Sequence, residues 1–452
     1  MTTIKNEKNG KWSQSITLKL ILVITLSLVL LIPSSMIRGL IEEREQRKNE
    51  TITEITGKWG AEQTICGPVL ILPYTVLTKQ ANGLTTETKE YYQVMPDKIK
   101  LSGNIDTEKR YRSIYEVLTF AGNFNITGNF SKLTDKEWPE NHHSILWNEA
   151  KLVIGISDLK GITRTINMNW NGSNKKFAPG NAKCTLFKTG VNTTINITPD
   201  GEYQFSVSFS LNGSNAIFIN PVANESEISL SADWNNPSFD GNFLPADKTI
   251  TDSGFIANWA TNDMNRNYPQ IISTGSYSAH FDYQKVGVKL LLPVDAYQKS
   301  TRSVKYALLF IGLTFLIMFF AEIIGKTRIH PVQYLIVGIA LVVFYSLLLA
   351  LAEYTGFNQA FIIAATVIIA MITAFIHSLF KTSVITLIIA LVLFLLYTYL
   401  FTVVQIADYA LIIGNVGLVI ILGLVMVFSK KIDWYANNQN MDTPSTNNIQ
   451  NE

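Results

Sequence analysis

Histidine and cysteine, the side chains that most often bind metals or act as bases and nucleophiles, are scarce in this sequence. The 452 residues include five histidines and two cysteines. The chain has no Cys-x-x-Cys pair, no His-Glu-x-x-His or Gly-x-Ser-x-Gly motif, and no Gly-rich phosphate-binding loop ending in Lys-Ser/Thr. These absences argue against the common hydrolases and ATP-driven machines. We therefore predict that the protein is not an enzyme, with no catalytic residue, metal site or cofactor.

Each histidine has a structural explanation. His142 and His143 lie in a polar stretch that is typical of a surface loop rather than a metal site. His330 stands directly before a proline at the start of an apolar run, where a helix cap or a contact with lipid headgroups is expected. His377 is predicted at a membrane interface, and His280 within a strand. No catalytic triad can be assembled from them.

Cys66 and Cys184 both lie in the segment that we expect to face an oxidising compartment. A disulfide between them is one interpretation. A long separation in sequence says nothing about the distance between two Cα atoms, so two free, buried cysteines are the alternative. The sequence leaves this choice open.

A transporter or channel would place ionisable groups near the middle of the membrane. Glu322 is the main candidate, but it lies near the end of its apolar run with Lys326 four residues on. Pairing with this lysine, or snorkelling to the interface, is the favoured interpretation, and a functional carboxylate is the alternative. Glu353 and Asp408 fall at helix ends. The apolar segments therefore give little support to ion transport.

Those apolar segments are long enough to cross a bilayer. In "RIHPVQYLIVGIALVVFY", residues 328–345, Pro331 suits the first turn of a helix, and about 20 apolar residues span the roughly 30 Å hydrocarbon layer. Only 16% of residues are charged, and the mean hydropathy is positive. Six such runs occur, at residues 18–37, 306–324, 332–352, 359–376, 384–404 and 409–428.

The predicted fold is a six-helix transmembrane bundle with a large antiparallel β-rich, sandwich-like periplasmic domain inserted between helices 1 and 2. The expected order is a cytoplasmic N-terminus (1–15), transmembrane helix 1 (16–40), the periplasmic domain with a stalk helix at its start (41–305), a five-helix bundle (306–428) and a cytoplasmic, partly disordered tail (429–452). The pattern to residue 37 favours an anchor over a cleaved signal peptide.

Orientation follows from the lysines and arginines of the short segments. They fall on one side of the predicted helices, at Lys5, Lys8, Lys11, Lys326, Arg328, Lys381, Lys430 and Lys431, whereas the opposite turns at 353–358 and 405–408 carry acids and no basic residue. Both termini are therefore predicted to be cytoplasmic.

The segment between the first two helices alternates with period two. In "EYQFSVSFSLNGSNAIFIN", apolar residues from Tyr203 to Leu211 alternate with Gln204 and serines, and Asn212-Gly213 suggests a tight turn before the next apolar run. We expect a β-hairpin here. Similar alternation at residues 152–156, 166–170, 228–230 and 286–292 predicts further strands, and no repeat indicates a propeller.

Two features of this domain permit a functional interpretation. Ile52, Ile55 and Trp59 share one helical face, so a stalk helix is expected to reach Gly60, as a mechanical element or simply as a solvated linker. Six tryptophans are the second feature, and they could stack on sugars or pack in a sandwich core: Trp59, Trp138, Trp147, Trp170, Trp234 and Trp259.

The sequence resembles the CreD family of bacterial inner-membrane proteins over residues 15–435. Besides the helical "RSVKYALLFIGLTFLIMFFAEIIGKT", the similar segments are "EITGKWGAEQTICGPVLILPY", "MPDKIKLSGNIDTEKRYRSIYEV", "SADWNNPSFDGNFLPADKTITDSGFIANW", "NRNYP" and "KIDWY". Asp97 replaces a Glu of the family pattern, Ser113 replaces a Gly in a local turn, and Cys66 stands where a small residue is usual.

The resemblance implies a role in cell envelope integrity and supplies no catalytic residue or substrate. Our first hypothesis is a non-enzymatic inner-membrane protein whose periplasmic β domain binds an envelope component. The alternative is a transporter or lipid-handling protein that uses the bundle and a groove in the β domain. The implied partners are the lipid bilayer and an envelope protein, lipid or glycan; no nucleic acid is expected, and the oligomeric state is not specified.

Overall fold

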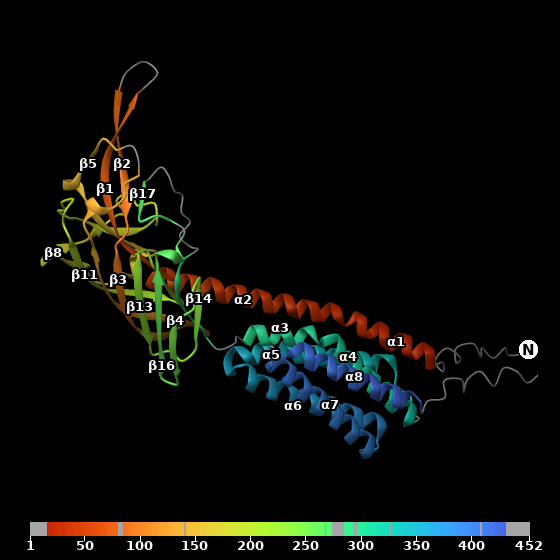
Figure 1. The fold of residues 1–452 in the computed structure, drawn as a ribbon. Helices are drawn as coiled ribbons and strands as arrows, with labels where there is room; N and C mark the ends of the chain where they lie inside the picture. The colour runs from red at the N-terminus through yellow and green to blue at the C-terminus, as the bar shows by residue number, and fades with distance from the viewer. Residues whose placement is uncertain are drawn as a thin grey trace, which may run out of the picture. The chain divides into compact units, whose positions relative to one another are not determined.

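The computed structural model describes residues 16–79, 85–139, 142–266, 268–273, 284–292, 296–325, 327–406 and 409–430. The chain forms two compact units. One, the helical unit, comprises Met1–Arg47 and Val294–Glu452, and the other, the β-rich unit, comprises Lys48–Pro293 (Figure 1).

The helical unit begins with a long helix that is interrupted once. α1 and α2 are separated by Leu30, because Pro33 has no N–H to donate to the carbonyl four residues earlier. Leu30 is buried and lies against Gly338 of α5, where a Cβ would come within 2.2 Å of its side chain. The helices are α1 Ile16–Val29, α2 Leu31–Trp59, α3 Ala296–Lys305, α4 Ala307–Ile324, α5 Pro331–Thr355, α6 Phe357–Phe380, α7 Ser383–Gln405 and α8 Ala410–Ser429.

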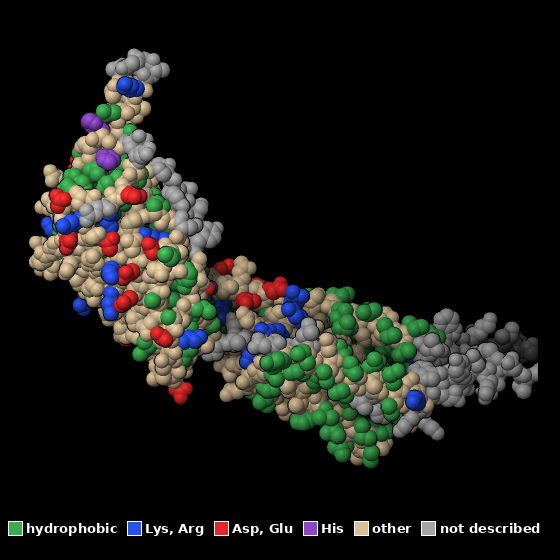
Figure 2. Space-filling model, viewed as in Figure 1, with side chains coloured by type: hydrophobic (Ala, Val, Ile, Leu, Met, Phe, Trp, Pro, Cys, Tyr) green, Lys and Arg blue, Asp and Glu red, His purple; other side chains and the backbone are tan. Residues whose placement is uncertain are grey.

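Five described helical segments are long and apolar enough to cross a membrane. They are Leu18–Trp59, Ala307–Ile324, Pro331–Thr355, Phe357–Phe380 and Ser383–Gln405, and the apolar stretch Ile412–Val427 of α8 is shorter. Hydrophobic side chains cover much of the visible surface of this unit (Figure 2). Exposure of so large an apolar surface to water is unfavourable, so this surface is suited to contact with lipid.

The start of α5 follows the sequence prediction. Pro331 occupies the first turn, and His330 is the N-cap, with its side chain accepting a hydrogen bond from the Val332 N–H. Gln333 completes a capping box by accepting from the His330 N–H at 2.9 Å. His330 therefore has a structural role.

α3 is an element that the sequence analysis did not predict. It is a ten-residue amphipathic helix directly before α4. Tyr297, Ser300 and Val304 are buried, whereas Arg302 and Lys305 belong to its basic last turn. The spacing of three and four residues between the buried positions is the pattern that could have revealed it.

The β-rich unit contains two sheets within the described residues. The first has ten strands: β1 Gln63–Lys79, β2 Thr85–Val94, β5 Ser144–Ile145, β6 Lys151–Ile156, β9 Ala178–Pro179, β10 Gly190–Thr194, β12 Ala216–Asn220, β14 Pro237–Gly241, β17 Ile271–Ser273 and β18 Val286–Leu290. The second has eight: β3 Lys98–Arg112, β4 Tyr115–Phe130, β7 Asn167–Trp170, β8 Ser173–Lys176, β11 Tyr203–Ser214, β13 Glu225–Ala232, β15 Asp247–Thr251 and β16 Gly254–Asn262.

One continuous hydrophobic core joins the two sheets. It includes Leu70 and Val153 from the first sheet and Leu101, Ile126 and Val207 from the second. The inward residues of β3 and β11 alternate with exposed ones, which is the period of two seen in the sequence. The sandwich-like arrangement therefore follows from the burial of one face of each sheet.

The prediction of an antiparallel domain is wrong at two strand pairs. β12 pairs with β1 in parallel, and β13 pairs with β3 in parallel. Parallel neighbours need a long connection between them, and here much of the domain intervenes in sequence. Local alternation cannot reveal this, because it reports which face of a strand is buried and not which partner it has.

The predicted hairpin at Asn212-Gly213 is also wrong. Both residues lie inside β11, and the chain changes sheets at Asn215, which has φ of 61°. β11 pairs with β4 and β7, whereas β12 pairs with β1 and β18. A Cβ on Gly213 would lie 2.4 Å from the ring of Phe120, so this glycine permits close packing and does not form the turn.

Candidate functional site

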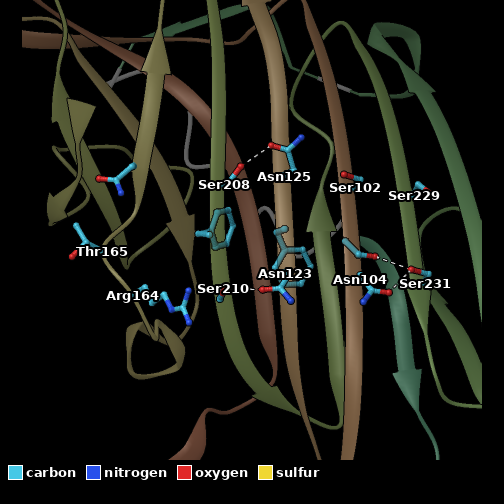
Figure 3. Close-up of a pocket in the computed structure, with 14 residues that line it drawn as sticks. Ser102, Asn104, Asn123, Asn125, Arg164, Thr165, Ser208, Ser210, Ser229 and Ser231 are labelled. Carbon is cyan, nitrogen blue, oxygen red and sulfur yellow. Dashed lines mark hydrogen bonds between the residues drawn. The ribbon is translucent and has the colours of Figure 1, made fainter. Parts of the chain in front are cut away.

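A polar groove crosses the second sheet on the face that points away from the core (Figure 3). Strand register places its side chains in two rows. One row consists of Asn167 on β7, Ser208 on β11, Asn125 on β4, Ser102 on β3 and Ser229 on β13. The second consists of Ser210, Asn123, Asn104 and Ser231 on four of these strands.

The rows result directly from strand alternation. On β3, Leu101, Gly103 and Ile105 are buried, so Ser102 and Asn104 are exposed on the opposite face. The same alternation operates on β4, β11 and β13. In the sequence, the serines of β11 are recognisable only as the polar residues of an alternating strand. Their alignment with asparagines depends on the register between distant strands.

Hydrogen bonds orient six of the nine side chains in these rows. Serine hydroxyls donate to asparagine side-chain oxygens in three pairs: Ser208 to Asn125 at 2.9 Å, Ser210 to Asn123 at 2.7 Å and Ser231 to Asn104 at 2.9 Å. Within the described residues, the amide N–H groups of Asn123 and Asn125 have no partner. They are oriented donors available to a ligand.

Charge is nearly absent from the groove, which has a volume of about 550 Å³. Arg164 is the single charged residue among those that line it. Beyond the groove on the same sheet face, Lys98 and Glu225 form a 2.7 Å ion pair, and Lys100 and Glu227 form one of 3.2 Å. The groove is therefore an almost uncharged hydrogen-bonding surface, and the charged residues next to it are paired with each other.

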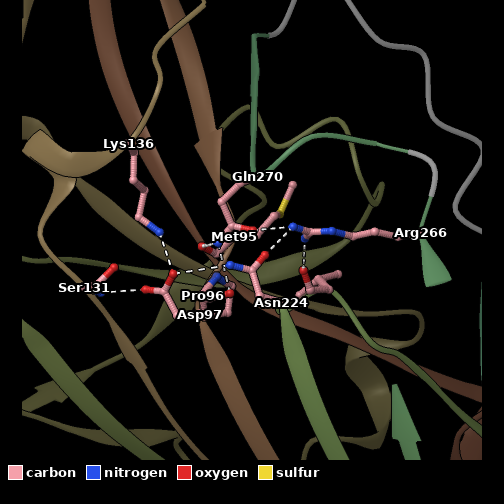
Figure 4. Close-up of polar contacts among 9 residues, drawn as sticks. Met95, Pro96, Asp97, Ser131, Lys136, Asn224, Arg266 and Gln270 are labelled. Atoms are coloured by element: carbon pink, nitrogen blue, oxygen red, sulfur yellow. Dashed lines mark hydrogen bonds and ion pairs between the residues drawn. The ribbon is translucent and has the colours of Figure 1, made fainter. Parts of the chain in front are cut away.

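A half-buried polar cluster holds the start of two strands that carry the groove, β3 and β13 (Figure 4). Asp97 directly precedes β3, and Asn224 directly precedes β13. The Glu225 N–H donates to the Asp97 carbonyl at 2.9 Å, and the Asn224 N–H donates to the Pro96 carbonyl at 3.2 Å. These contacts fix the parallel register of β3 and β13, and hence the alignment of the serines and asparagines above.

Ion pairing and hydrogen bonds complete this cluster. Lys136 donates to Asp97 at 2.7 Å, and the Ser131 N–H donates to the other carboxylate oxygen at 2.6 Å. Burial by itself would raise the pKa of Asp97, but these two partners outweigh it and hold the pKa below its usual value. Arg266 donates to the side chains of Asn224 and Gln270, and burial lowers its pKa. The cluster is a structural support for the groove.

The contacts of the six tryptophans favour packing over sugar stacking. Trp170 and Trp259 are buried in the core, and the other four are half-buried. Trp59, at the end of α2, has the Arg110 guanidinium 3.4 Å from its ring centroid, and its indole N–H points to the Phe120 carbonyl. Packing is therefore the role that these contacts support.

The cysteines are free and buried. Burial raises the pKa of both thiols, that of Cys184 to about 12, and proximity to Cys184 raises that of Cys66 further. Cys184 contacts the Gln93 side-chain oxygen at 3.2 Å. No group of three or more metal-binding side chains occurs among the described residues. His142 lies near Tyr92, and His280 falls outside the described residues.

Glu322 lies inside the helical unit rather than at its surface. It is 5% exposed, pairs with Lys19 of α1, and accepts hydrogen bonds from the Tyr334 hydroxyl at 3.0 Å and the Ile329 N–H at 3.1 Å. Snorkelling is therefore excluded. Lys326, the local partner that we favoured, falls outside the described residues. Lys19 is more than 300 residues away in sequence, so no local pattern indicated it.

Further polar contacts link α2, α3, α5 and α7 in the helical unit. Tyr297 of α3 donates to Glu353 at 2.9 Å, and Arg44 approaches the same carboxylate at 4.0 Å. Lys299 donates to Gln405 at 2.8 Å. Within the described helices, aromatic and aliphatic side chains fill the interior and Glu322 is the buried charged residue.

An apolar groove of about 690 Å³ lies between α4, α7 and α8. Apolar side chains such as Leu313, Ile389 and Ile420 line it together with Tyr399. The Tyr399 hydroxyl donates to the Ile413 and Gly414 carbonyls at 3.2 and 3.1 Å, and a Cβ on Gly417 would lie 2.2 Å from it. Gly417 therefore permits close packing of α7 on α8, whereas a Cβ on Gly414 would meet nothing within 4 Å.

Long apolar helices together with a large two-sheet domain define a membrane protein with a substantial β-rich part. The model of the family "Inner membrane protein CreD" matches residues 15–435. The chain therefore belongs to the CreD family of inner membrane proteins. It is 31% identical over 419 residues to the inner membrane protein CreD of Escherichia coli (strain K12), a match that covers 90% of this chain and 91% of that protein.

Proposed function

We propose that this chain is a non-enzymatic inner-membrane protein that supports the integrity of the cell envelope by binding an envelope component through its β-rich domain. In this proposal six helical segments cross the membrane, namely the α1–α2 segment and α4 to α8. Both termini are cytoplasmic, and the β-rich domain, inserted between the first and second spans, is periplasmic.

The observation that carries this proposal is the neutral groove on the second sheet. A large polar sheet face needs no aligned asparagines to remain soluble, because isolated charges serve that purpose equally well. Here the exposed residues are mostly uncharged and partly unpaired, and a half-buried polar cluster fixes the starts of two of the strands that carry them. Such an arrangement supports ligand recognition, and membership of an inner-membrane family supports an envelope component as the ligand.

In-cell photo-crosslinking tests this proposal. A photoreactive amino acid at Ser102 or Ser229, both in the groove, should capture an envelope component, and the same probe at Gln204, on the same sheet face but outside the groove, should not. A deletion strain should also become sensitive to detergent and recover with the wild-type gene. Equal capture at all three positions, together with normal detergent resistance, would overturn the proposal.

The topology needs its own measurement. A reporter that is active only in the cytoplasm should be active when it is fused to either terminus. A cysteine introduced at Asp247, on an exposed edge strand of the β-rich domain, should react with a membrane-impermeant maleimide in intact spheroplasts. A maleimide reaction that requires membrane permeabilisation would place the domain on the cytoplasmic side.

The apolar groove between α4, α7 and α8 favours a second candidate function, lipid handling. Its volume suits part of an acyl chain, and its lining is almost wholly apolar. Native mass spectrometry of the purified protein should then show a retained lipid that is lost when Val416→Trp, at an exposed position of the lining, fills the groove. If the same lipid remains on this variant, the groove is simply the lipid-facing surface of the bundle.

A further inference from the structure

We propose that the groove on the second sheet binds a glycan strand of uncharged sugar rings, laid across strands β7, β11, β4, β3 and β13. This inference rests on the proposed function, since it names the chemical class of the envelope component. In this proposal, hydrogen bonds recognise the sugars. Stacking on tryptophan rings is not part of it, because the tryptophans are buried or half-buried.

Spacing is the first argument. Neighbouring strands lie about 4.8 Å apart, so each row presents one polar side chain per strand at that interval. This repeat is close to the length of one sugar ring in an extended glycan. The first row runs across five strands, from Asn167 to Ser229, and the second runs beside it two residues along each strand. The rows therefore extend over about the length of four or five rings of an extended glycan.

Hydrogen-bond chemistry is the second argument. Sugar hydroxyls both donate and accept, and an acetamido group does the same with its N–H and carbonyl. The unpaired amide N–H groups of Asn123 and Asn125 supply donors. The hydroxyl oxygens of Ser208 and Ser210, which donate to those asparagines, keep lone pairs that accept. Donors and acceptors therefore alternate over the central strands, which suits a polyhydroxylated ligand.

Charge separates this ligand from the alternatives. A polyanion would be expected to meet several basic residues, and Arg164 is the single one in the lining. A protein partner would be expected to meet an apolar centre, yet Phe124 and Phe209, the large apolar residues in the lining, are 2% and 7% exposed. A peptide strand adds to the edge of a sheet, whereas this groove lies on its face. A neutral glycan is the class that remains.

The test uses the full-length protein in lipid nanodiscs, with binding followed by saturation-transfer NMR and titration calorimetry. Two probes distinguish recognition of acetamido groups from recognition of hydroxyl groups. Chitohexaose carries acetamido groups, and cellohexaose carries hydroxyls alone. Wild-type protein should bind chitohexaose. The double variant Asn123→Asp, Asn125→Asp, which keeps the side-chain shape but removes the donors and adds charge, should bind at least about tenfold more weakly.

Gln204→Glu is the matched control, because it adds a charge on the same face of β11 outside the groove and should bind like wild type. Thermal unfolding of each variant verifies that the domain is folded. Binding of cellohexaose equal to that of chitohexaose supports a hydroxyl-directed glycan site, and preference for chitohexaose supports an acetamido-directed one.

Absence of binding to both sugars by wild-type protein, or equal binding by the double variant, overturns the glycan proposal. The proposed function fails separately. If the sugars do not bind but the in-cell probes at Ser102 and Ser229 still capture one envelope protein, the domain recognises another class of component. If neither sugar binding nor capture is observed, both proposals are wrong.

Discussion

The Tyr334 hydroxyl donates to Glu322 at 3.0 Å and so joins α5 to the end of α4 through a carboxylate that is almost fully buried. Lys19 of α1 pairs with the same carboxylate. Three helices from opposite parts of the sequence therefore meet at one acidic side chain.

Glu322→Ala is expected to destabilise the helical unit. The change leaves Lys19 and Tyr334 without their acceptor, and a pair broken on one side costs several kcal/mol when fully buried. Because Lys19 is 32% exposed, we expect a smaller loss, about 2 kcal/mol in the free energy of unfolding. Chemical denaturation in mixed micelles measures it.

Glu42→Ala is the matched control for this measurement. Glu42 pairs with Arg38 at 3.0 Å on α2, and both side chains are more than half exposed. Exposed pairs contribute about 0.5 kcal/mol or less, so this variant should unfold almost as wild type does. Equal losses for the two variants would mean that the Glu322 cluster does not hold the helices together.

Asp97→Asn should change the dependence of stability on pH. The pKa of Asp97 lies below its usual value, so its carboxylate stabilises the folded state fully above the unfolded-state pKa of about 4. This contribution is lost as pH falls through the lower folded-state pKa. The difference between wild type and Asp97→Asn should therefore be largest near pH 7, about 1–3 kcal/mol, and shrink below about pH 4.

Urea titrations at a series of pH values, followed by tryptophan fluorescence, provide the measurement. Asp247→Asn is the control, because Asp247 is exposed on the edge strand β15 and no ion pair holds its carboxylate among the described residues. A constant difference between Asp97→Asn and wild type from pH 7 to pH 3 would show that Lys136 and Ser131 do not depress this pKa.

Residue patterns predicted the strands well and their partners poorly. The alternation from Tyr203 to Leu211 gave β11, and the apolar residues at 228–230 gave part of β13. Asn212-Gly213 suggested a turn because those residues favour turns locally. The preference of Asn-Gly for a turn is outweighed here by the packing of Gly213 against Phe120, a residue far away in sequence.

The polar groove could not be predicted from the sequence for the same reason, because the partner of each strand was unknown. Ser102, Asn125 and Ser208 look like ordinary solvent-facing residues when each strand is considered alone. Their alignment requires the register of β3 with β4 and of β4 with β11, and only the folded structure determines it. The same reason applies to Glu322. Its partner Lys19 could not be predicted without knowing how α1 packs on α4.

Gln63→Leu should destabilise the β-rich unit. Gln63 is fully buried, and its amide donates to the Asn212 carbonyl at 2.9 Å and the Asp158 carbonyl at 3.1 Å. Leucine has a similar volume but leaves these buried groups unsatisfied, so we expect a loss of about 2–3 kcal/mol. Thermal unfolding measures it, with the exposed Gln204→Leu as the control, for which a change within about 0.5 kcal/mol is expected.

Cys66 and Cys184 should resist alkylation in the native protein. Burial raises the pKa of both thiols and also blocks access, and the thiolate is the form that reacts. With iodoacetamide at pH 8, both should react at least about a hundredfold more slowly than a cysteine introduced by Ser102→Cys on the exposed sheet face.

Mass spectrometry of alkylated peptides gives the rates site by site, and full modification should appear once urea unfolds the domain. The comparison within one variant, Ser102→Cys, removes differences in reagent and detergent, because all three thiols share one sample. Rapid modification of Cys184 in the native state would mean that the segment carrying it opens readily, since its pKa of about 12 leaves almost no thiolate in the closed form.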